Sequence, residues 1–127
     1  MHLLLDTCAL VWLGMGGGGL GADARRRIEA APTLYYSSIS AWEIARLAKE
    51  AKIDLAVPPG EFLSDLADQY GLVSLPPTDE TMLRAAQLPD FHKDPADRII
   101  IATALLHDLP IVTGDTRFPQ YGVRTLC

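Results

Sequence analysis

The sequence lacks the features of a secreted, membrane-spanning or nucleic-acid-coating protein. Its two cysteines, Cys8 and Cys127, are too few for a disulfide scaffold and have no metal-ligand spacing, so we expect a cytoplasmic protein. No apolar window is long enough to span a bilayer, and we expect no membrane association. The formal net charge of −5 argues against general electrostatic coating of nucleic acid, but it leaves room for an acidic site neutralised by metal.

Two further signatures are missing. The glycine run Gly16–Gly19 has no Gly-Lys-Ser/Thr ending, so a phosphate-cradling loop is not expected. The histidines His2, His92 and His107 show no zinc spacing, and His107 is expected at the end of a helix. What remains is a chain of 127 residues, 49% apolar and 21% charged, without repeats or an internal boundary. We expect residues 1–127 to form one globular domain.

Short apolar runs alternate with helical segments along the whole chain. An all-apolar run suits a parallel strand that is covered on both faces. The pattern predicts a three-layer α/β/α domain with a mainly parallel sheet of about five strands. The expected strands are Leu3–Leu5, Leu34–Tyr36, Gly71–Leu75, Leu109–Thr113 and Gly122–Leu126, and the expected helices are Ala9–Leu13, Ala22–Ala31, Ala41–Ala51, Glu61–Tyr70, Asp79–Leu88 and Pro95–His107.

The clearest helix start lies before the apolar block Ile99–Leu106. Asp94 suits the N-cap, Pro95 suits the first helical position, and Asp97 follows three residues after the cap. The apolar block predicts a buried helix, and burying it brings the charged N-terminus into the protein or into a cleft. Two carboxylates at such a place are either capping groups or a cation site.

Four acids from distant parts of the chain are expected at one edge of the sheet. Asp6 and Asp115 follow predicted strands, whereas Glu43 and Asp97 begin predicted helices. In an open parallel sheet, sites form beyond the carboxyl ends of the strands. Each acid also has a structural alternative: Asp6 as an N-cap, Asp115 in an ordinary turn, and Glu43 and Asp97 in capping boxes with Ser40 and Asp94.

The four acids together favour a metal site. Their like charges would crowd one cleft unless a cation lay between them, and helix N-termini cannot cancel several charges. Oxygen ligands alone favour Mg²⁺ or Mn²⁺ over zinc. A hard divalent ion in an acidic cleft suits phosphodiester chemistry, because it acidifies the attacking water and neutralises charge on the phosphorus oxygens.

Four segments resemble the ordered motifs of PIN-domain proteins, and within that family they are most similar to the VapC-like toxins of type II toxin–antitoxin pairs. The resemblance implies a PIN-like α/β/α fold and a Mg²⁺-dependent endoribonuclease that cuts RNA and blocks translation. It also implies homodimerisation and a cognate antitoxin that covers the cleft and supplies the DNA binding. The segments are Leu4–Thr7, Ser40–Ile44, Phe91–Ala104 and Ile111–Asp115.

The resemblance also assigns roles within these segments. It implies that one acidic quartet binds the metal and performs catalysis, with a further accessory or capping acid and two hydroxyls that position a ligand or water. Several cations are candidates for contacts with RNA, although Arg25–Arg27 better fit a solvated helix face. The quartet is Asp6, Glu43, Asp97 and Asp115; the accessory acid is Asp94; the hydroxyls are Thr7 and Thr113; the cations are Lys93, Arg98 and Arg117.

Three other functions compete with this interpretation. A phosphatase with Asp6 as nucleophile would need an acid two residues later, where Cys8 stands. A phospho-acceptor receiver domain would need an acid at the end of the third strand, where the chain has Leu75-Pro76-Pro77. The more serious rival is a catalytically inactive PIN-like module that binds only metal or a partner.

Overall fold

A five-stranded parallel sheet forms the centre of the computed structural model, which describes residues 2–127. The strand order is β3-β2-β1-β4-β5, and all four pairings are parallel. The central strand β1 is fully buried, as expected for a strand covered on both faces. The strands are β1 (Leu3–Leu5), β2 (Leu34–Ser37), β3 (Leu72–Leu75), β4 (Ile111–Val112) and β5 (Thr125–Leu126).

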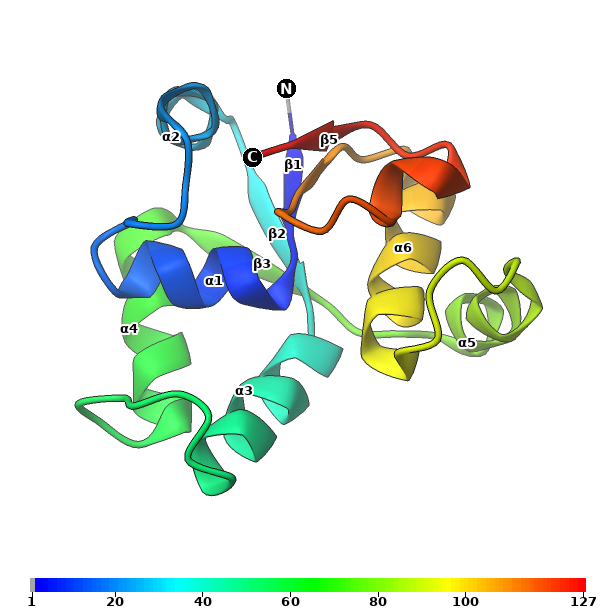
Figure 1. The fold of residues 1–127 in the computed structure, drawn as a ribbon. Helices are drawn as coiled ribbons and strands as arrows, with labels where there is room; N and C mark the ends of the chain where they lie inside the picture. The colour runs from blue at the N-terminus through cyan, green and yellow to red at the C-terminus, as the bar shows by residue number, and fades with distance from the viewer. Residues whose placement is uncertain (1) are drawn as a thin grey trace.

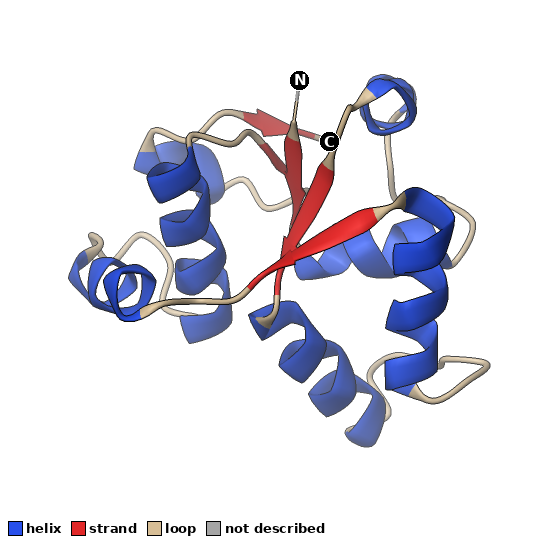
Figure 2. Cartoon of the chain, turned by 180° about the vertical axis from the view of Figure 1, so that it is seen from behind, coloured by secondary structure: helices blue, strands red, loops and turns tan. Residues whose placement is uncertain are grey.

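Helices cover both faces of the sheet and complete the predicted α/β/α architecture (Figures 1 and 2). In Figure 1, α1 and α4 lie on one side of the sheet, α5 and α6 lie on the other, and α3 packs against α1, α4 and α6. The helices are α1 (Thr7–Gly14), α2 (Ala22–Ala30), α3 (Ile39–Lys49), α4 (Pro59–Tyr70), α5 (Asp79–Gln87) and α6 (Pro95–His107), with a short 3₁₀ helix η1 (Phe118–Tyr121). Among the helices of residues 2–127, none is long and apolar enough to cross a membrane.

The alternation of side chains in β1 builds one core on each face of the sheet. Leu3 and Leu5 pack in the cluster that α1, α2 and α4 cover, whereas Leu4 packs with Ile100 and Ile101 of α6. Fully burying such a side chain contributes about 1.5–3 kcal/mol. The sheet and α6 are therefore held in one register, which fixes where the N-terminus of α6 lies.

The predicted start of α6 is confirmed. Asp94 is the N-cap, and its Oδ1 accepts hydrogen bonds from the backbone N–H groups of Ala96, at 2.9 Å, and Asp97, at 3.4 Å. Such a cap stabilises a helix by about 1 kcal/mol. The helix is buried over most of its length and ends at His107, as predicted.

The start of α3 differs from the prediction. The helix begins at Ile39 with Ser38 as the N-cap, and it ends at Lys49 because Ala51 adopts a left-handed φ of 56°. The predicted capping box between Ser40 and Glu43 is wrong, since Ser40 lies inside the helix. Glu43 is therefore not occupied by a capping interaction.

The last two strands are shorter than predicted. β4 contains only Ile111 and Val112, because the chain turns after Val112 and the Thr113 hydroxyl accepts the backbone N–H of Asp115. β5 is correspondingly limited to its two parallel partners. Phe118, fully buried, begins a 3₁₀ helix that the sequence did not indicate.

The strand order creates a topological switch point between β1 and β4. From β1 the chain first adds β2 and β3 on one side, and it later adds β4 and β5 on the other. The connections that leave β1 and β4 therefore diverge, which opens space beyond their carboxyl ends. Asp6 and Asp115 are the acids that follow these two strands.

Candidate active site

The structure brings the four predicted acids together beyond the carboxyl ends of β1 and β4. Asp6, Asp97 and Asp115 line a hollow of about 260 Å³. Glu43, from α3, is close enough that its charge raises the pKa of both Asp6 and Asp97. Four segments that are distant in the sequence therefore place four carboxylates in one electrostatic neighbourhood.

Asp6 is held both as a helix cap and as a buried acid. Its Oδ1 accepts the backbone N–H of Ala9 at 2.8 Å, which makes it the N-cap of α1. Burial raises its pKa to about 6, although hydrogen bonds with the Thr113 side chain and the Ala9 backbone lower it. Thr113 thus links Asp6 to the turn that carries Asp115.

Asp97 has the most perturbed acidity of the four. Burial, followed by the charges of Asp94, Glu43, Asp6 and Asp115 in that order, raises its pKa to about 7. The predicted capping box with Asp94 is wrong, because the backbone N–H of Asp94 donates to a neighbouring histidine ring instead. The Asp97 side chain is therefore free to face the other acids.

Glu43 carries a buried oxygen that lacks a partner. The residue is 7% exposed, and within residues 2–127 its Oε1 has no hydrogen-bond partner. Its Oε2 lies 3.9 Å from Nη2 of Arg46, which also pairs with Glu50 at 2.7 Å. An unpaired carboxylate oxygen in a buried place is costly unless a positive charge lies beside it.

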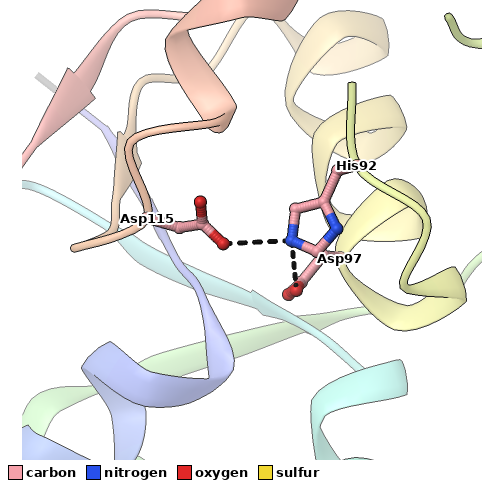
Figure 3. A group of neighbouring side chains, drawn as sticks. All are labelled: His92, Asp97 and Asp115. Atoms are coloured by element: carbon pink, nitrogen blue, oxygen red, sulfur yellow. Dashed lines mark hydrogen bonds and ion pairs between the residues drawn. The ribbon is translucent and has the colours of Figure 1, made fainter. Parts of the chain in front are cut away.

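His92, which the sequence analysis considered only as a zinc ligand, lies between two of the acids (Figure 3). Its Nε2 is 2.9 Å from Oδ2 of Asp97 and 3.0 Å from Oδ2 of Asp115. Because Nδ1 accepts the N–H of Asp94 at 3.2 Å, the proton of the neutral ring resides on Nε2. That nitrogen donates to both carboxylates, so without an ion His92 orients the acids. One ligand atom from each of His92, Asp97 and Asp115 lies within 4.8 Å of the others, so the three side chains also have the spacing of a metal-binding group.

The sequence offered a partial signal for His92. The residue comes two positions before the N-cap Asp94, so a ring acceptor for the cap's N–H is locally plausible. Its contact with Asp115 spans 23 residues and depends on the sheet topology. The orienting role was therefore beyond any local pattern.

Asp115 is the best-paired of the four acids. Arg117 donates to its Oδ1 from the backbone N and Nε, and to its Oδ2 from Nη2 at 2.8 Å. These bonds lower the pKa of Asp115 to about 2. Arg117, predicted as a candidate for RNA contact, is exposed and lies directly beside the acidic hollow.

Arg98 was expected beside the acids, but the structure does not place it at the site. It is 9% exposed and donates to the backbone carbonyls of Ala85, Ala86, Leu88, Pro89 and His92. The guanidinium is held by the 85–92 segment, and Arg98 is not among the residues that line the acidic hollow. Because its guanidinium is engaged by backbone carbonyls, the structure does not favour Arg98 as a contact for RNA.

The remaining predicted residues divide between structural and surface positions. The Thr7 hydroxyl is 2.9 Å from that of Ser40 and ties α1 to α3, so it does not face the hollow directly. Lys93 is exposed next to the N-cap of α6. The three arginines Arg25–Arg27 are exposed on α2, as expected for a solvated face.

The acids fit a hard divalent cation. The donor set consists of carboxylate oxygens, which Mg²⁺ and Mn²⁺ prefer, and it includes the orphaned Oε1 of Glu43. The raised pKa values of Asp6 and Asp97 show that the protein alone does not balance these charges. A positive ion among Asp6, Glu43 and Asp97 would remove both costs.

Comparison with known proteins gives consistent similarities. The family model for the PIN domain matches residues 3–123. The chain is 37% identical over 120 residues to ribonuclease VapC22 of Mycobacterium tuberculosis, a match that covers 94% of this chain and 91% of that protein.

Two solved structures share the fold. A toxin–antitoxin complex from Klebsiella pneumoniae contains a chain with 25% identity and a TM-score of 0.64, covering 90% of this chain and 87% of that one. VapBC2 from Rickettsia felis, bound to a DNA fragment from its promoter, has 14% identity and a TM-score of 0.72, with coverage of 98% and 97%.

Proposed function

This chain belongs to the PIN-domain family, and we propose that it is an endoribonuclease that depends on Mg²⁺, with Mn²⁺ as an alternative ion. The observation that carries the proposal is the charge imbalance at the hollow. Three carboxylates line it, the charge of nearby Glu43 raises the pKa of Asp6 and Asp97, and Glu43 Oε1 is left without a partner among the described residues. The 37% identity to a ribonuclease over most of the chain supports RNA as the substrate.

Asp6, Glu43 and Asp97 would hold the ion, with Asp115 completing the acidic quartet. When bound, the ion would acidify a water for attack on the phosphodiester and neutralise charge on the phosphorus oxygens. His92 keeps the Oδ2 atoms of Asp97 and Asp115 turned toward each other. Asp94 acts as an accessory residue, because its cap fixes the helix end from which Asp97 projects.

The biological role that we propose is that of a VapC-like toxin. Cutting RNA would inhibit translation, and a cognate antitoxin would neutralise the enzyme and contribute the DNA binding. The 25% identity to a chain of a toxin–antitoxin complex supports this assignment, as does the net charge of −5, which leaves operator binding to a basic partner. A homodimer is the expected assembly.

A catalytically inactive module that binds only metal or a partner is not favoured. Such a module would not need all four acids, yet each of them is present and faces the same neighbourhood. The hydrogen bonds of His92 also fix the positions of the Asp97 and Asp115 carboxylates, which simple partner binding does not require.

Cleavage of RNA by the purified protein tests the proposal. We would incubate labelled RNA with the protein in Mg²⁺, in Mn²⁺ and in EDTA, and repeat the assay with Asp6→Asn and Asp97→Asn. Asp68→Asn, at an exposed position on α4, is the matched control for loss of a surface carboxylate. We expect metal-dependent cleavage by the parent and by the control, and none by the two site variants.

Metal titration separates the alternatives. Calorimetry with Mg²⁺ should show binding that Asp97→Asn weakens. Absence of cleavage of any RNA, together with tight metal binding, would support the inactive module and overturn the nuclease proposal. Cleavage that persists in EDTA would equally exclude the proposed metal dependence.

A further inference from the structure

The hollow that contains the acids also has an aromatic wall. Besides Asp6, Asp97 and Asp115, it is lined by Cys8, Trp12 and Gly114. Trp12 comes from the second turn of α1, one turn beyond Cys8, and its ring is only partly buried. The hollow therefore combines an acidic rim with an uncharged, partly aromatic side, and the nuclease chemistry above uses only the rim.

Two glycines determine where the indole ring lies. A Cβ at Gly19 would come within 2.3 Å of Cδ2 of Trp12 and within 2.4 Å of Cε2, so Gly19 covers one face of the ring. A Cβ at Gly114 would come within 2.9 Å of Cη2, at the far end of the ring. No side chain fits at either position without moving the indole, so the glycine loop and the turn before Asp115 jointly hold it beside the acids.

The loop itself is anchored to α1. The backbone N–H of Gly17 donates to the Trp12 carbonyl at 2.6 Å, and Arg25 of α2 donates to the Gly17 carbonyl. Gly16 and Gly17 have φ values of 91° and 80°, which only glycine adopts readily. Within the glycine run, Gly19 is the residue that passes closely over the indole.

We propose that Trp12 is a binding platform for one unpaired RNA base, on which the base stacks while the adjoining phosphate lies at the acidic rim. This inference rests on the proposed function and names the form of RNA that the site accepts. A nucleotide matches the hollow in two parts: its base offers a π-face to the indole, and its anionic phosphate would lie at the rim where the proposed divalent ion offsets the carboxylates. A volume of about 260 Å³ is just below the roughly 300–1,000 Å³ of typical ligand pockets, which suits a single base.

The pairing state of the base follows from the same geometry. A base inside a duplex is stacked on both faces and cannot reach a side-chain platform, whereas an unpaired base can be splayed out.

Fluorescence of Trp12 provides a direct test. The chain has two tryptophans, and the second, Trp42, is 58% exposed on α3 with the Arg46 guanidinium over its ring. In a Trp42→Phe protein, Trp12 is the only tryptophan. In Mg²⁺, before cleavage proceeds, the emission would be followed by stopped flow during mixing with three probes: random single-stranded RNA hexamers, abasic hexamers with the same backbone, and an RNA duplex.

We expect the single-stranded hexamers to quench Trp12 emission and the other two probes to bind with at least fivefold lower apparent affinity or without quenching. Stacking of a base on an aromatic ring corresponds to roughly 5- to 100-fold in affinity. Equal quenching by the abasic hexamer would show that the phosphates alone are responsible. Equal quenching by the duplex would show that pairing does not matter, and either result would overturn the inference.

Steady-state kinetics give a second, independent measurement. Trp12→Leu should raise the KM for single-stranded RNA by roughly 5- to 100-fold and change kcat much less, and Trp12→Phe should recover most of the loss. Trp42→Leu is the matched control and should change neither constant. If Trp12→Leu does not fold, as judged by its circular dichroism melt, Trp12→Phe and the fluorescence titration decide.

These outcomes distinguish the inference from the proposed function. A parent protein that cuts RNA, with unchanged KM in the Trp12 variants and no base-dependent quenching, would refute the platform and leave the nuclease intact. Base-dependent quenching in a protein that cuts no RNA would refute the nuclease and retain the platform.

Discussion

The two halves of the acidic site differ in how the protein treats their charge. On the side of α6 and β4, Asp97 and Asp115 share the donor of His92, and Asp115 also accepts three hydrogen bonds from Arg117. On the side of β1 and α3, Asp6 and Glu43 have no cationic partner at hydrogen-bond distance among the described residues. The first half is oriented by the protein itself, whereas the second half requires something that the chain does not supply.

This difference suggests a division of labour. Oriented carboxylates can keep their positions when an ion arrives or leaves, because the donors that hold them remain. Unpaired carboxylates supply the attraction for the ion, since their repulsion is relieved only when it binds. The site thus combines rigidity on one side with unsatisfied charge on the other.

The largest expected effect comes from removing a charge on either side. Asp6→Asn and Asp97→Asn should each lower the rate of RNA cleavage by about 100-fold or more, since losing even an outer partner of a metal site typically costs 10–100-fold. Asn also caps helices, so Asp6→Asn should keep α1 intact. Rates measured at saturating Mg²⁺, with circular dichroism as the folding control, check this; activity within threefold of the parent would contradict it.

The next largest effect is expected from disturbing the oriented half of the site, Asp97 and Asp115, without removing either acid. His92→Gln removes the donor that Asp97 and Asp115 share, so we expect Mg²⁺ affinity and activity to fall by about 10- to 100-fold. His107→Gln, at the exposed end of α6, is the matched control and should leave both unchanged. Calorimetry of Mg²⁺ binding measures the affinity, and wild-type affinity in His92→Gln would show that the histidine does not orient the acids.

A pH series of melting temperatures measures the cost of ionising Asp6 and Asp97, one acid from each half of the site. The pKa values of Asp6 and Asp97 are raised to about 6 and about 7 from 3.8, so the folded protein holds these protons to higher pH than the unfolded chain. Their contribution is complete below about pH 4 and is lost as pH rises to about 7, a loss on the order of 5 kcal/mol when the partial exposure of Asp97 is allowed for. In EDTA the melting temperature should therefore fall over this interval.

Mg²⁺ should flatten that pH series, because an ion stabilises the ionised acids. The lowered pKa of Asp115, about 2, acts in the other direction, but its contribution is lost only as pH falls from about 4 toward 2, outside the interval. Asp6→Asn combined with Asp97→Asn is the control and should also flatten the series. A melting temperature of the metal-free protein that rises between pH 4 and pH 7 would rule out the charge imbalance.

The smallest expected effect compares one acid from each half in metal-free protein. Glu43→Gln should leave the melting temperature unchanged or raise it by the equivalent of about 1 kcal/mol, because it removes a buried charge whose ion pair with Arg46 is long, at 3.9 Å, and whose Oε1 has no partner among the described residues. Asp115→Asn should lower the melting temperature by the equivalent of about 1 kcal/mol or more, because charge-assisted hydrogen bonds from Arg117 are lost. Thermal melts in EDTA give both values, and a shift of the same sign in both variants would remove the distinction between the halves.

The elements of the fold were largely predictable because their signals are local. The apolar run Leu3–Leu5 and the Asp94-Pro95 helix start each carry their own reason for adopting a strand or a helix, and both were confirmed. The predicted start of α3 was wrong because Ser40 matched the pattern of an N-cap. In the fold, the Ser40 hydroxyl instead forms a hydrogen bond with that of Thr7, 33 residues away. A serine before a helical pattern does not show which partner will claim its hydroxyl.

The site was predictable in its acids and not in their supports. Asp6 and Asp97 stand where a strand ends or a helix begins, and the parallel topology then brings such positions to one edge. His92 and Arg98 owe their roles to the packing of the 85–92 segment on α6, which no periodicity encodes. Their exchange of roles, with the histidine at the site and the arginine away from it, is a consequence of tertiary contacts.

Arg98 follows Asp97 directly in the chain, yet its guanidinium hydrogen-bonds to the 85–92 segment instead of lying among the acids. Arg98 donates hydrogen bonds to the carbonyl of His92, at 2.9 Å, and to carbonyls of the preceding loop. These hydrogen bonds help to fix the position of the His92 imidazole. Substitution of Arg98 would remove these hydrogen bonds, so it would both loosen the 85–92 segment and misalign the His92 imidazole. A screen for loss of the proposed nuclease activity should therefore recover Arg98 variants beside variants of the acids, although Arg98 does not line the hollow.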